Sequence, residues 1–391
     1  MNPAIHIPEW YRDRPYARQR YARIAHWALA QHPFYQKHVP DPDREFPVLT
    51  RAMLQANNDL LLNGHPETAR TSGSTATPVR MSWDAARSRQ EKADTRLMIE
   101  WLGGALPSLS IVSTWVHAAD ERTIDVLTLL PQQVEYLRQR NRADGTCSLI
   151  TYPSNLELLS GYIIEQQLDM SFVRRVTCLS EVYEPRHDEL IRAAFPNAVA
   201  NVTYSSVEAG MIASRCPHRP ENYHIMAHKL GVEFLNEQGR PCQHGELGRV
   251  VVTDFENRRS PLIRYAQGDL AAPMHCDCGK ILLPAMTQIV GKVQGVFRTR
   301  EGRPIIFTHF SPMFRDSPEI GQYQVVQEAF DRFTVRCVPR AGADLAPFKQ
   351  RVRQRFEQEF GPNLSIDYEI LAEIPRAASG KFHVAICRIP D

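Results

Sequence analysis

The sequence has no uninterrupted apolar run near the roughly 18 residues that a membrane-spanning helix needs. The segment 1–20 carries several charged side chains where a signal peptide would need an apolar run. The 8 cysteines in 391 residues are too few for a disulfide scaffold and fit reduced thiols. We therefore expect a soluble, cytoplasmic chain with no membrane partner.

An excess of charge of one sign is also missing. The 46 basic and 44 acidic residues give a net charge of +2, which offers no electrostatic reason to expect nucleic acid as a partner. Internal repeats are absent, and 43% hydrophobic with 23% charged residues describes an ordinary folded globule. The length fits one large and one small domain.

The first two thirds of the chain alternate β-rich and helical runs, which predicts a layered α/β core. Strands are expected at 111–116, 175–179, 198–203 and 249–252, and helices at 17–32, 51–62, 85–101, 155–167 and 185–195. Later runs predict strands at 323–326, 333–338 and 365–370 and a helix at 345–360. We predict a large layered α/β N-terminal domain over 1–291 and a small mobile α+β C-terminal domain over 292–391.

Four separated polar motifs offer groups that bind phosphates, metals or sugars. The first is a hydroxyl-rich turn that can wrap a phosphate but lacks the Gly-Lys-Ser/Thr ending of a P-loop; it consists of Thr71, Ser72, Gly73, Ser74 and Thr75. Taken alone, such a motif is often an ordinary turn.

The other three motifs lie farther along the chain. Tyr204, Ser205 and Glu208 directly follow a predicted strand, where open α/β sheets bind ligands. Asp269 follows a Gly turn and suits a ribose diol, although turn aspartates often bond their own backbone. Lys381 lies on a Gly-containing loop as a point charge for a phosphate or carboxylate.

In their order and spacing these motifs resemble the core motifs of the acyl-adenylate-forming superfamily of acyl-CoA ligases, and more narrowly its phenylacetate-CoA ligase-like branch. Supporting matches are Pro-Phe-Tyr at 33–35, Phe-Pro-Val-Leu at 46–49, Tyr-Pro-Ser at 152–154 and Pro-Leu-Ile-Arg-Tyr at 261–265. The resemblance implies a two-step reaction that uses ATP, Mg²⁺ and coenzyme A. A carboxylate first attacks the α-phosphate of ATP, and a thiol then takes the acyl group.

The resemblance also implies a role for each motif. Residues 71–75 would hold the β- and γ-phosphates, Tyr204 would form the adenine face, and Asp269 would bind the ribose. Ser205 is a further cofactor-binding residue, at the position where the superfamily usually has Gly. Glu208 would hold Mg²⁺, and Lys381 would neutralise charge that develops at the α-phosphate. Lys292 stands at the hinge position, where the superfamily usually has Arg.

The acyl pocket is implied by analogy alone. It would lie between 111–116 and 179–183, with Trp115, His117 and Tyr183 as an aromatic lining and an aromatic acid as substrate. The alternative is that these three side chains are ordinary core or surface residues.

Four further residues suggest a structural Zn²⁺ site. Cys276 and Cys278 stand one residue apart, while Cys216 and His224 fall on the arms of a predicted hairpin, 211–216 and 223–227. Three thiolates and an imidazole form a donor set that tetrahedral Zn²⁺ uses. His218 is a rival fourth ligand, and plain buried thiols are the alternative.

The sequence thus favours an aryl-CoA ligase and leaves two rivals open. One rival passes the acyl group to a carrier-protein thiol or stops at the adenylate, since Val207 and Lys292 depart from the superfamily pattern. The other is a non-catalytic binding protein on the same fold. A homodimer is left open as well.

Overall fold

The computed structural model describes residues 5–39, 41, 45–71, 77–113, 120–290, 296–307, 310, 313–314, 317–376 and 382–389. The chain forms two compact units, one over Met1–Ile289 and the other over Val290–Ala377 with Lys381–Asp391. The predicted boundary at 291–295 lies outside the described residues.

The larger unit contains most of the secondary structure. Its helices are α1 (Glu9–Arg12), α2 (Pro15–Gln31), α3 (Pro33–His38), α4 (Arg51–Ala56), α5 (Asn58–Leu62), α6 (Ala85–Trp101), α7 (Leu130–Asp144), α8 (Pro153–Glu165) and α9 (Pro185–Ala194). Its strands are β1 (Ala69–Arg70), β2 (Arg80–Met81), β3 (Ser108–Val112), β4 (Thr123–Asp125), β5 (Ser148–Thr151), β6 (Arg175–Leu179), β7 (Val199–Ser206), β8 (Gly210–Arg215), β9 (Tyr223–Ile225), β10 (Leu230–Leu235), β11 (Gly248–Asp254), β12 (Tyr265–Met274) and β13 (Ala285–Val290).

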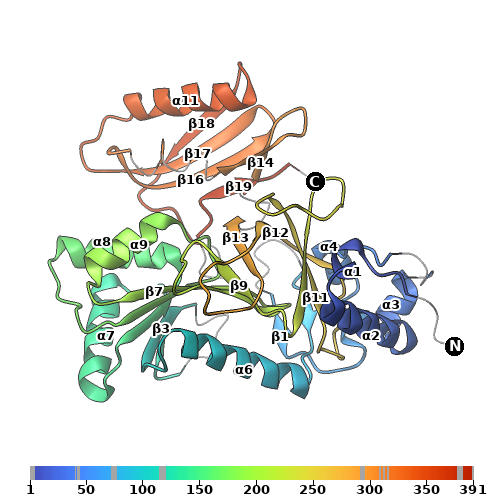
Figure 1. Ribbon diagram of the computed structural model, residues 1–391. Coiled ribbons are helices and arrows are strands. Elements are labelled where there is room, and N and C mark those ends of the chain that lie inside the picture. The colour runs from blue at the N-terminus through green and yellow to red at the C-terminus, as the bar shows by residue number, and fades with distance from the viewer. Residues whose placement is uncertain are drawn as a thin grey trace. The chain divides into compact units, whose positions relative to one another are not determined.

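Eleven of these strands form one sheet in the order β10-β11-β12-β13-β9-β8-β7-β6-β5-β3-β4. Strands β3 to β7 pair in parallel, whereas β7 and β8 pair antiparallel. The sheet therefore joins a parallel half to an antiparallel half at β7. Helices α8 and α9 cover one face of the parallel half and α6 lies on the other (Figure 1).

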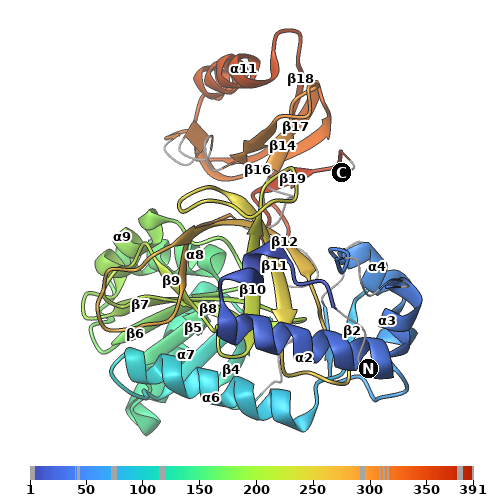
Figure 2. The same ribbon diagram turned by 45° about the vertical axis from the view of Figure 1, so that its right-hand side comes forward.

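Apolar residues at sheet and helix positions bury these faces. Leu109 of β3 and Val176 of β6 pack with Leu156 of α8 and Ile191 of α9 in one cluster. On the opposite face, Met98 of α6 packs with methionines of the antiparallel half. Helices α2 and α3 lie on the side of β11 (Figure 2), and their apolar residues form a third buried cluster with Tyr265 of β12.

Local sequence sets several helix ends. Thr50 caps α4 by accepting a hydrogen bond from the backbone N–H of Met53. Asp84 caps α6 in the same way, with the N–H of Arg87 as donor. Asn63 ends α5 in a left-handed conformation with φ of 47°, which Asn tolerates better than most residues.

The smaller unit has its own sheet. It contains β14 (Val296–Arg298), β15 (Pro304–Ile306), β16 (Ile320–Ala329), β17 (Arg332–Pro339), α11 (Ala346–Phe360), β18 (Ser365–Ile370) and β19 (Ala385–Cys387). The four-stranded sheet has the order β18-β17-β16-β19. Phe348, Val352 and Phe356 of α11 are fully buried, in a core that is rich in phenylalanine.

The predicted α/β fold class is confirmed. The helix expected at 51–62 is two helices, α4 and α5, because the backbone departs from helical geometry at Asn57. The strand expected at 198–203 is β7, which continues to Ser206. In the described part of the chain, helices long and apolar enough to cross a bilayer are absent.

The phenylalanine core gives a stability prediction for the smaller unit. Phe356 is 0% exposed and contacts the rings of Phe310, Phe333 and Phe360. We expect Phe356→Ala to lower the free energy of unfolding of this unit by about 3–5 kcal/mol, through lost burial and a cavity. Amide hydrogen exchange of β16 and β17 during urea titration would measure it.

The matched control is Phe330→Ala, because Phe330 is 38% exposed. It should cost less than about 1 kcal/mol. Equal losses in the two variants would contradict the assignment of this core.

Candidate functional site

The structure describes only some of the residues predicted to form sites. Thr71, Tyr204, Ser205, Glu208, Asp269, Tyr183 and the four Cys/His residues lie in the described part. The predictions that fall outside it are Ser72, Gly73, Ser74, Thr75, Trp115, His117, Lys292 and Lys381.

Thr71 lies at the base of the hydroxyl-rich turn and is 5% exposed. Its backbone N–H donates to the carbonyl of Val79, and its hydroxyl accepts from the backbone N–H of Val79 at 2.9 Å. The Thr71 hydroxyl also accepts from Nη2 of Arg51 at 2.8 Å. Thr71 therefore links the segment directly after β1 to Val79 and Arg51, a structural task that its predicted phosphate role did not include.

Glu208 lies in the turn between β7 and β8 and is 4% exposed. Its Oε1 accepts a hydrogen bond from the hydroxyl of Tyr265 at 2.9 Å and lies 3.3 Å from Nη1 of Arg51. Arg51 thus bridges Thr71 and Glu208, which are 137 positions apart in the chain (208 − 71).

Tyr204 of β7 and Asp269 of β12 form the second contact of this region. The Tyr204 hydroxyl donates to Oδ2 of Asp269 at 2.7 Å. Burial, and next the negative charge of Asp269, raise the pKa of Tyr204 well above its ordinary value, and Glu208 adds to the effect. The phenol therefore stays neutral and acts as a donor. Ser205 follows Tyr204 and pairs with Met211 across the hairpin.

These contacts define what we call the carboxylate cluster: Arg51, Thr71, Tyr204, Glu208, Tyr265 and Asp269. Burial and the charge of Glu208 raise the pKa of Tyr265, and the charge of Asp269 contributes as well. Each of the two carboxylates therefore raises the pKa of both tyrosines. The cluster contains two carboxylates, and the guanidinium of Arg51 contacts one of them, Glu208. Such a cluster suits a hard divalent cation with oxygen ligands.

Arg51 and Tyr265 had no predicted role. Arg51 carried a weak signal, because it begins α4, where a cation opposes the helix dipole unless an anion lies nearby. Glu208 supplies that anion. Tyr265 is 1% exposed and is indistinguishable in sequence from a core aromatic.

The Tyr183 side chain makes contacts with neighbouring charged residues. Its hydroxyl donates to Oδ1 of Asp188 at 2.8 Å, and Arg215 pairs with both oxygens of Asp188 at 2.8 and 2.7 Å. The Arg215 guanidinium also lies over the Tyr183 ring. Tyr183 has a structural role here, and its part in an acyl pocket stays a prediction.

The structure brings the four predicted metal ligands together. Cys216 directly follows β8, His224 lies in β9, and Cys276 and Cys278 follow β12. The ligand atoms of these four residues all lie within 4.8 Å of one another. Sγ of Cys276 and Sγ of Cys216 are 3.8 Å apart, and Sγ of Cys278 is 3.7 Å from Nε2 of His224.

These separations fit a tetrahedral metal. A zinc–sulfur bond of about 2.3 Å puts two tetrahedral sulfurs about 3.8 Å apart, whereas a disulfide needs about 2.05 Å. Nδ1 of His224 lies 3.1 Å from the carbonyl of Leu283, which fixes the proton on Nδ1 and leaves Nε2 to accept a metal. Within the described residues, the cluster takes in His224 and not its rival His218.

Comparison with solved structures shows the fold. The chain superposes on 2-hydroxyisobutyryl-CoA ligase, solved in a postadenylation state with 2-HIB-AMP, with a TM-score of 0.73 and 17% identity over 97% of this chain and 90% of that one. This chain has the fold of the acyl-adenylate-forming superfamily. The superfamily fold expected from the four motifs is thus confirmed.

Other solved structures match over less of their length. The amide bond synthetase McbA of Marinactinospora thermotolerans gives a TM-score of 0.57 at 17% identity, over 80% of this chain and 66% of that one. ATP-bound MatB of Rhodopseudomonas palustris gives 0.58 at 13% identity, over 80% and 65%.

Sequence comparison points to CapK. A family model described as the CapK C-terminal domain matches residues 297–388. Protein CapK of Staphylococcus aureus is 22% identical over 276 residues, which are 65% of this chain and 55% of CapK. The chain therefore matches little more than half the length of that relative.

Proposed function

We propose that this chain activates a carboxylic acid with Mg²⁺-ATP as an acyl-adenylate and then transfers the acyl group to a thiol, with coenzyme A as the acceptor. The carboxylate cluster supports this proposal most directly. It joins three of the four predicted motifs, from Thr71, the β7–β8 hairpin and β12, at one place in the larger unit.

Each described residue has a role that its contacts can support. Glu208 provides the carboxylate for Mg²⁺, while Arg51 offsets the negative charge of the phosphates. Asp269 binds the ribose hydroxyls, and its hydrogen bond from Tyr204 fixes one carboxylate oxygen. Adenylyl transfer needs positioning and charge neutralisation more than covalent help, and the cluster supplies both.

Residues outside the described part take their roles from the superfamily resemblance. Residues 72–75 hold the β- and γ-phosphates, and Lys381 neutralises charge at the α-phosphate during adenylation. Lys292 acts at the hinge, so that the smaller unit moves as a lid between the two steps.

The substrate in this proposal is an aromatic acid, from the resemblance to the phenylacetate-CoA ligase-like branch. Trp115, His117 and Tyr183 remain the candidate lining. A carrier-protein thiol is the alternative acceptor. A cytoplasmic location and a homodimer stay predictions.

The Cys/His cluster binds one structural Zn²⁺ in this proposal. Four protein ligands fill a tetrahedral shell, so the ion has no open position for catalysis. It ties the segment after β12 to the β8–β9 hairpin, because Cys276 and Cys278 follow β12, Cys216 directly follows β8 and His224 lies in β9. Asp269 lies on the same strand that this ion would anchor.

The first prediction of the proposed function tests the carboxylate cluster. Glu208→Gln keeps the side-chain shape but removes the charge that would hold Mg²⁺, and should slow adenylation by about 100-fold or more. Pyrophosphate release with a panel of aromatic and aliphatic acids would measure it. Exposed Glu237→Gln is the matched control and should act as wild type.

Two outcomes would reject the assignment. Wild-type rates in Glu208→Gln would remove Glu208 from the site. Absence of pyrophosphate release from the unaltered protein with every acid would favour a binding protein on the same fold.

The second prediction concerns Lys381. Lys381→Ala should slow adenylate formation by about 100-fold but leave thioester formation from a supplied adenylate and coenzyme A within about 3-fold, because the charge it neutralises develops only in the first step. Single-turnover assays of the two half-reactions would separate them. Equal losses in both steps would contradict the lid role.

The third prediction concerns the metal. Protein purified without chelators should contain about one zinc per chain, and Cys278→Ser should lose it, because three remaining ligands bind zinc more weakly. Elemental analysis would measure zinc in both, with Cys147→Ser, which lies outside the cluster, as the control. A zinc-free wild type, or equal zinc in all three proteins, would refute the site.

A further inference from the structure

The turn that presents Glu208 is very short. Glu208 lies between the end of β7 at Ser206 and the start of β8 at Gly210, and the Ser206 hydroxyl accepts from the N–H of Ala209 at 3.0 Å. Because the Glu208 side chain is buried, its direction depends on the backbone of these few residues. Contacts that hold the backbone of Ala209 and Gly210 therefore also orient the Glu208 carboxylate.

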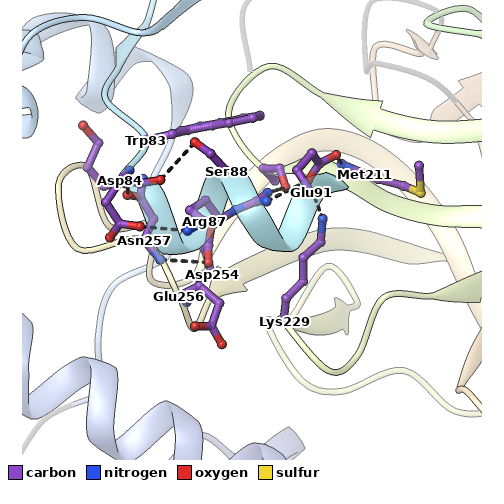
Figure 3. A network of polar contacts seen from close by, with 12 residues as sticks. Trp83, Asp84, Arg87, Ser88, Glu91, Met211, Lys229, Asp254, Glu256 and Asn257 are labelled. Carbon is purple, nitrogen blue, oxygen red and sulfur yellow. Dashed lines mark hydrogen bonds and ion pairs between the residues drawn. The ribbon is translucent and has the colours of Figure 1, made fainter. Parts of the chain in front are cut away.

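Two side chains of α6 hold this backbone from outside the hairpin. Nη2 of Arg87 donates to the carbonyl of Ala209, and Oε1 of Glu91 accepts from the N–H of Met211 at 2.7 Å. Arg87 and Glu91 are one helical turn apart and also pair with each other at 2.7 Å. Figure 3 shows both side chains projecting from α6, with Glu91 reaching Met211.

The approach is so close that it requires glycine at position 210. Gly210 has φ of +65°, and a Cβ there would come closer than 3.0 Å to Oε2 of Glu91 and Nη2 of Arg87. A glycine in this conformation permits the two charged groups to reach the backbone on either side of it.

Further charges keep the two α6 side chains in place. Arg87 is 0% exposed, and its Nε donates to Oδ2 of Asp254 at 2.6 Å. Nζ of Lys229, itself fully buried, lies 2.7 Å from Oε2 of Glu91, and Figure 3 shows it approaching Glu91 from a different side than Arg87. Burial opposes the charge of Glu91, but Lys229 and Arg87 together lower its pKa below the ordinary value, so it stays ionised.

We propose that Arg87 and Glu91 are positioning residues that clamp the β7–β8 turn and thereby aim the Glu208 carboxylate at the Mg²⁺ of the nucleotide. This inference rests on the proposed role of Glu208. Neither residue touches the nucleotide in this proposal, and both act through the backbone of Ala209 and Met211.

The test compares Glu91→Met with Lys229→Met. Each removes one member of the same buried ion pair, but only Glu91→Met removes a contact to the turn, because Lys229 contacts Glu91 and Asp94 instead. We expect Glu91→Met to raise the Mg²⁺ concentration for half-maximal pyrophosphate release by about 10- to 100-fold, as small displacements of a catalytic group do. Lys229→Met should raise this concentration by less than about 10-fold, because Glu91 keeps its ion pair with Arg87 and its hydrogen bond from the N–H of Met211.

A second measurement is independent of activity. Hydrogen exchange of peptides that cover 207–215 should be faster in Glu91→Met than in Lys229→Met, because the Met211 N–H loses its acceptor. If Glu91→Met does not fold, Arg87→Lys keeps the buried charge but removes the bond to Ala209, and should change both measurements in the same direction.

The outcomes separate the two proposals. Faster exchange with an unchanged Mg²⁺ requirement would reject the positioning role while the proposed function stands. Unchanged exchange in both Glu91→Met and Arg87→Lys would reject the clamp itself. A wild type without Mg²⁺-dependent activity, whatever the exchange shows, would reject the proposed function and with it the role of the clamp in catalysis.

Discussion

In the large sheet, β6 and β7 run parallel, whereas β8 returns antiparallel to β7. Parallel strands all present their carboxyl ends at one edge, and the tight return to β8 places Glu208 at that edge. Tyr265 at the start of β12 and Arg51 at the start of α4 reach the same carboxylate. The contacts of the carboxylate cluster therefore depend on this change of strand direction.

Sequence patterns were sufficient where the determining interactions are local. The helical runs expected at 85–101 and 185–195 match α6 and α9 closely, and the β-rich run at 175–179 matches β6 residue for residue. The single helix expected at 51–62 was wrong, because the helix is interrupted at Asn57. No proline or glycine near this position announces the interruption in the sequence. Such interruptions depend on packing around the helix and are invisible in the helix's own sequence.

Contacts between distant segments could not be derived in this way. Arg87 reaches Asp254 across 167 positions, and an arginine in an amphipathic helix would ordinarily be assigned to the solvated face. Tyr265 and Arg51 posed the same difficulty, because only the fold decides which carboxylate they meet. The order of four motifs identified the superfamily fold, yet the residues that support those motifs required coordinates.

The closeness of Gly210 to Arg87 and Glu91 also restricts how this chain can evolve. A methyl group at position 210 would collide with both side chains and would also need a left-handed backbone, so Gly210 is required as long as Arg87 and Glu91 keep their positions. Shortening Arg87 would leave Asp254 without this ion pair, and shortening Glu91 would remove one of the two carboxylates that contact the buried Lys229. Substitutions at these sites are therefore expected to arise jointly, and homologous sequences should differ there as a set.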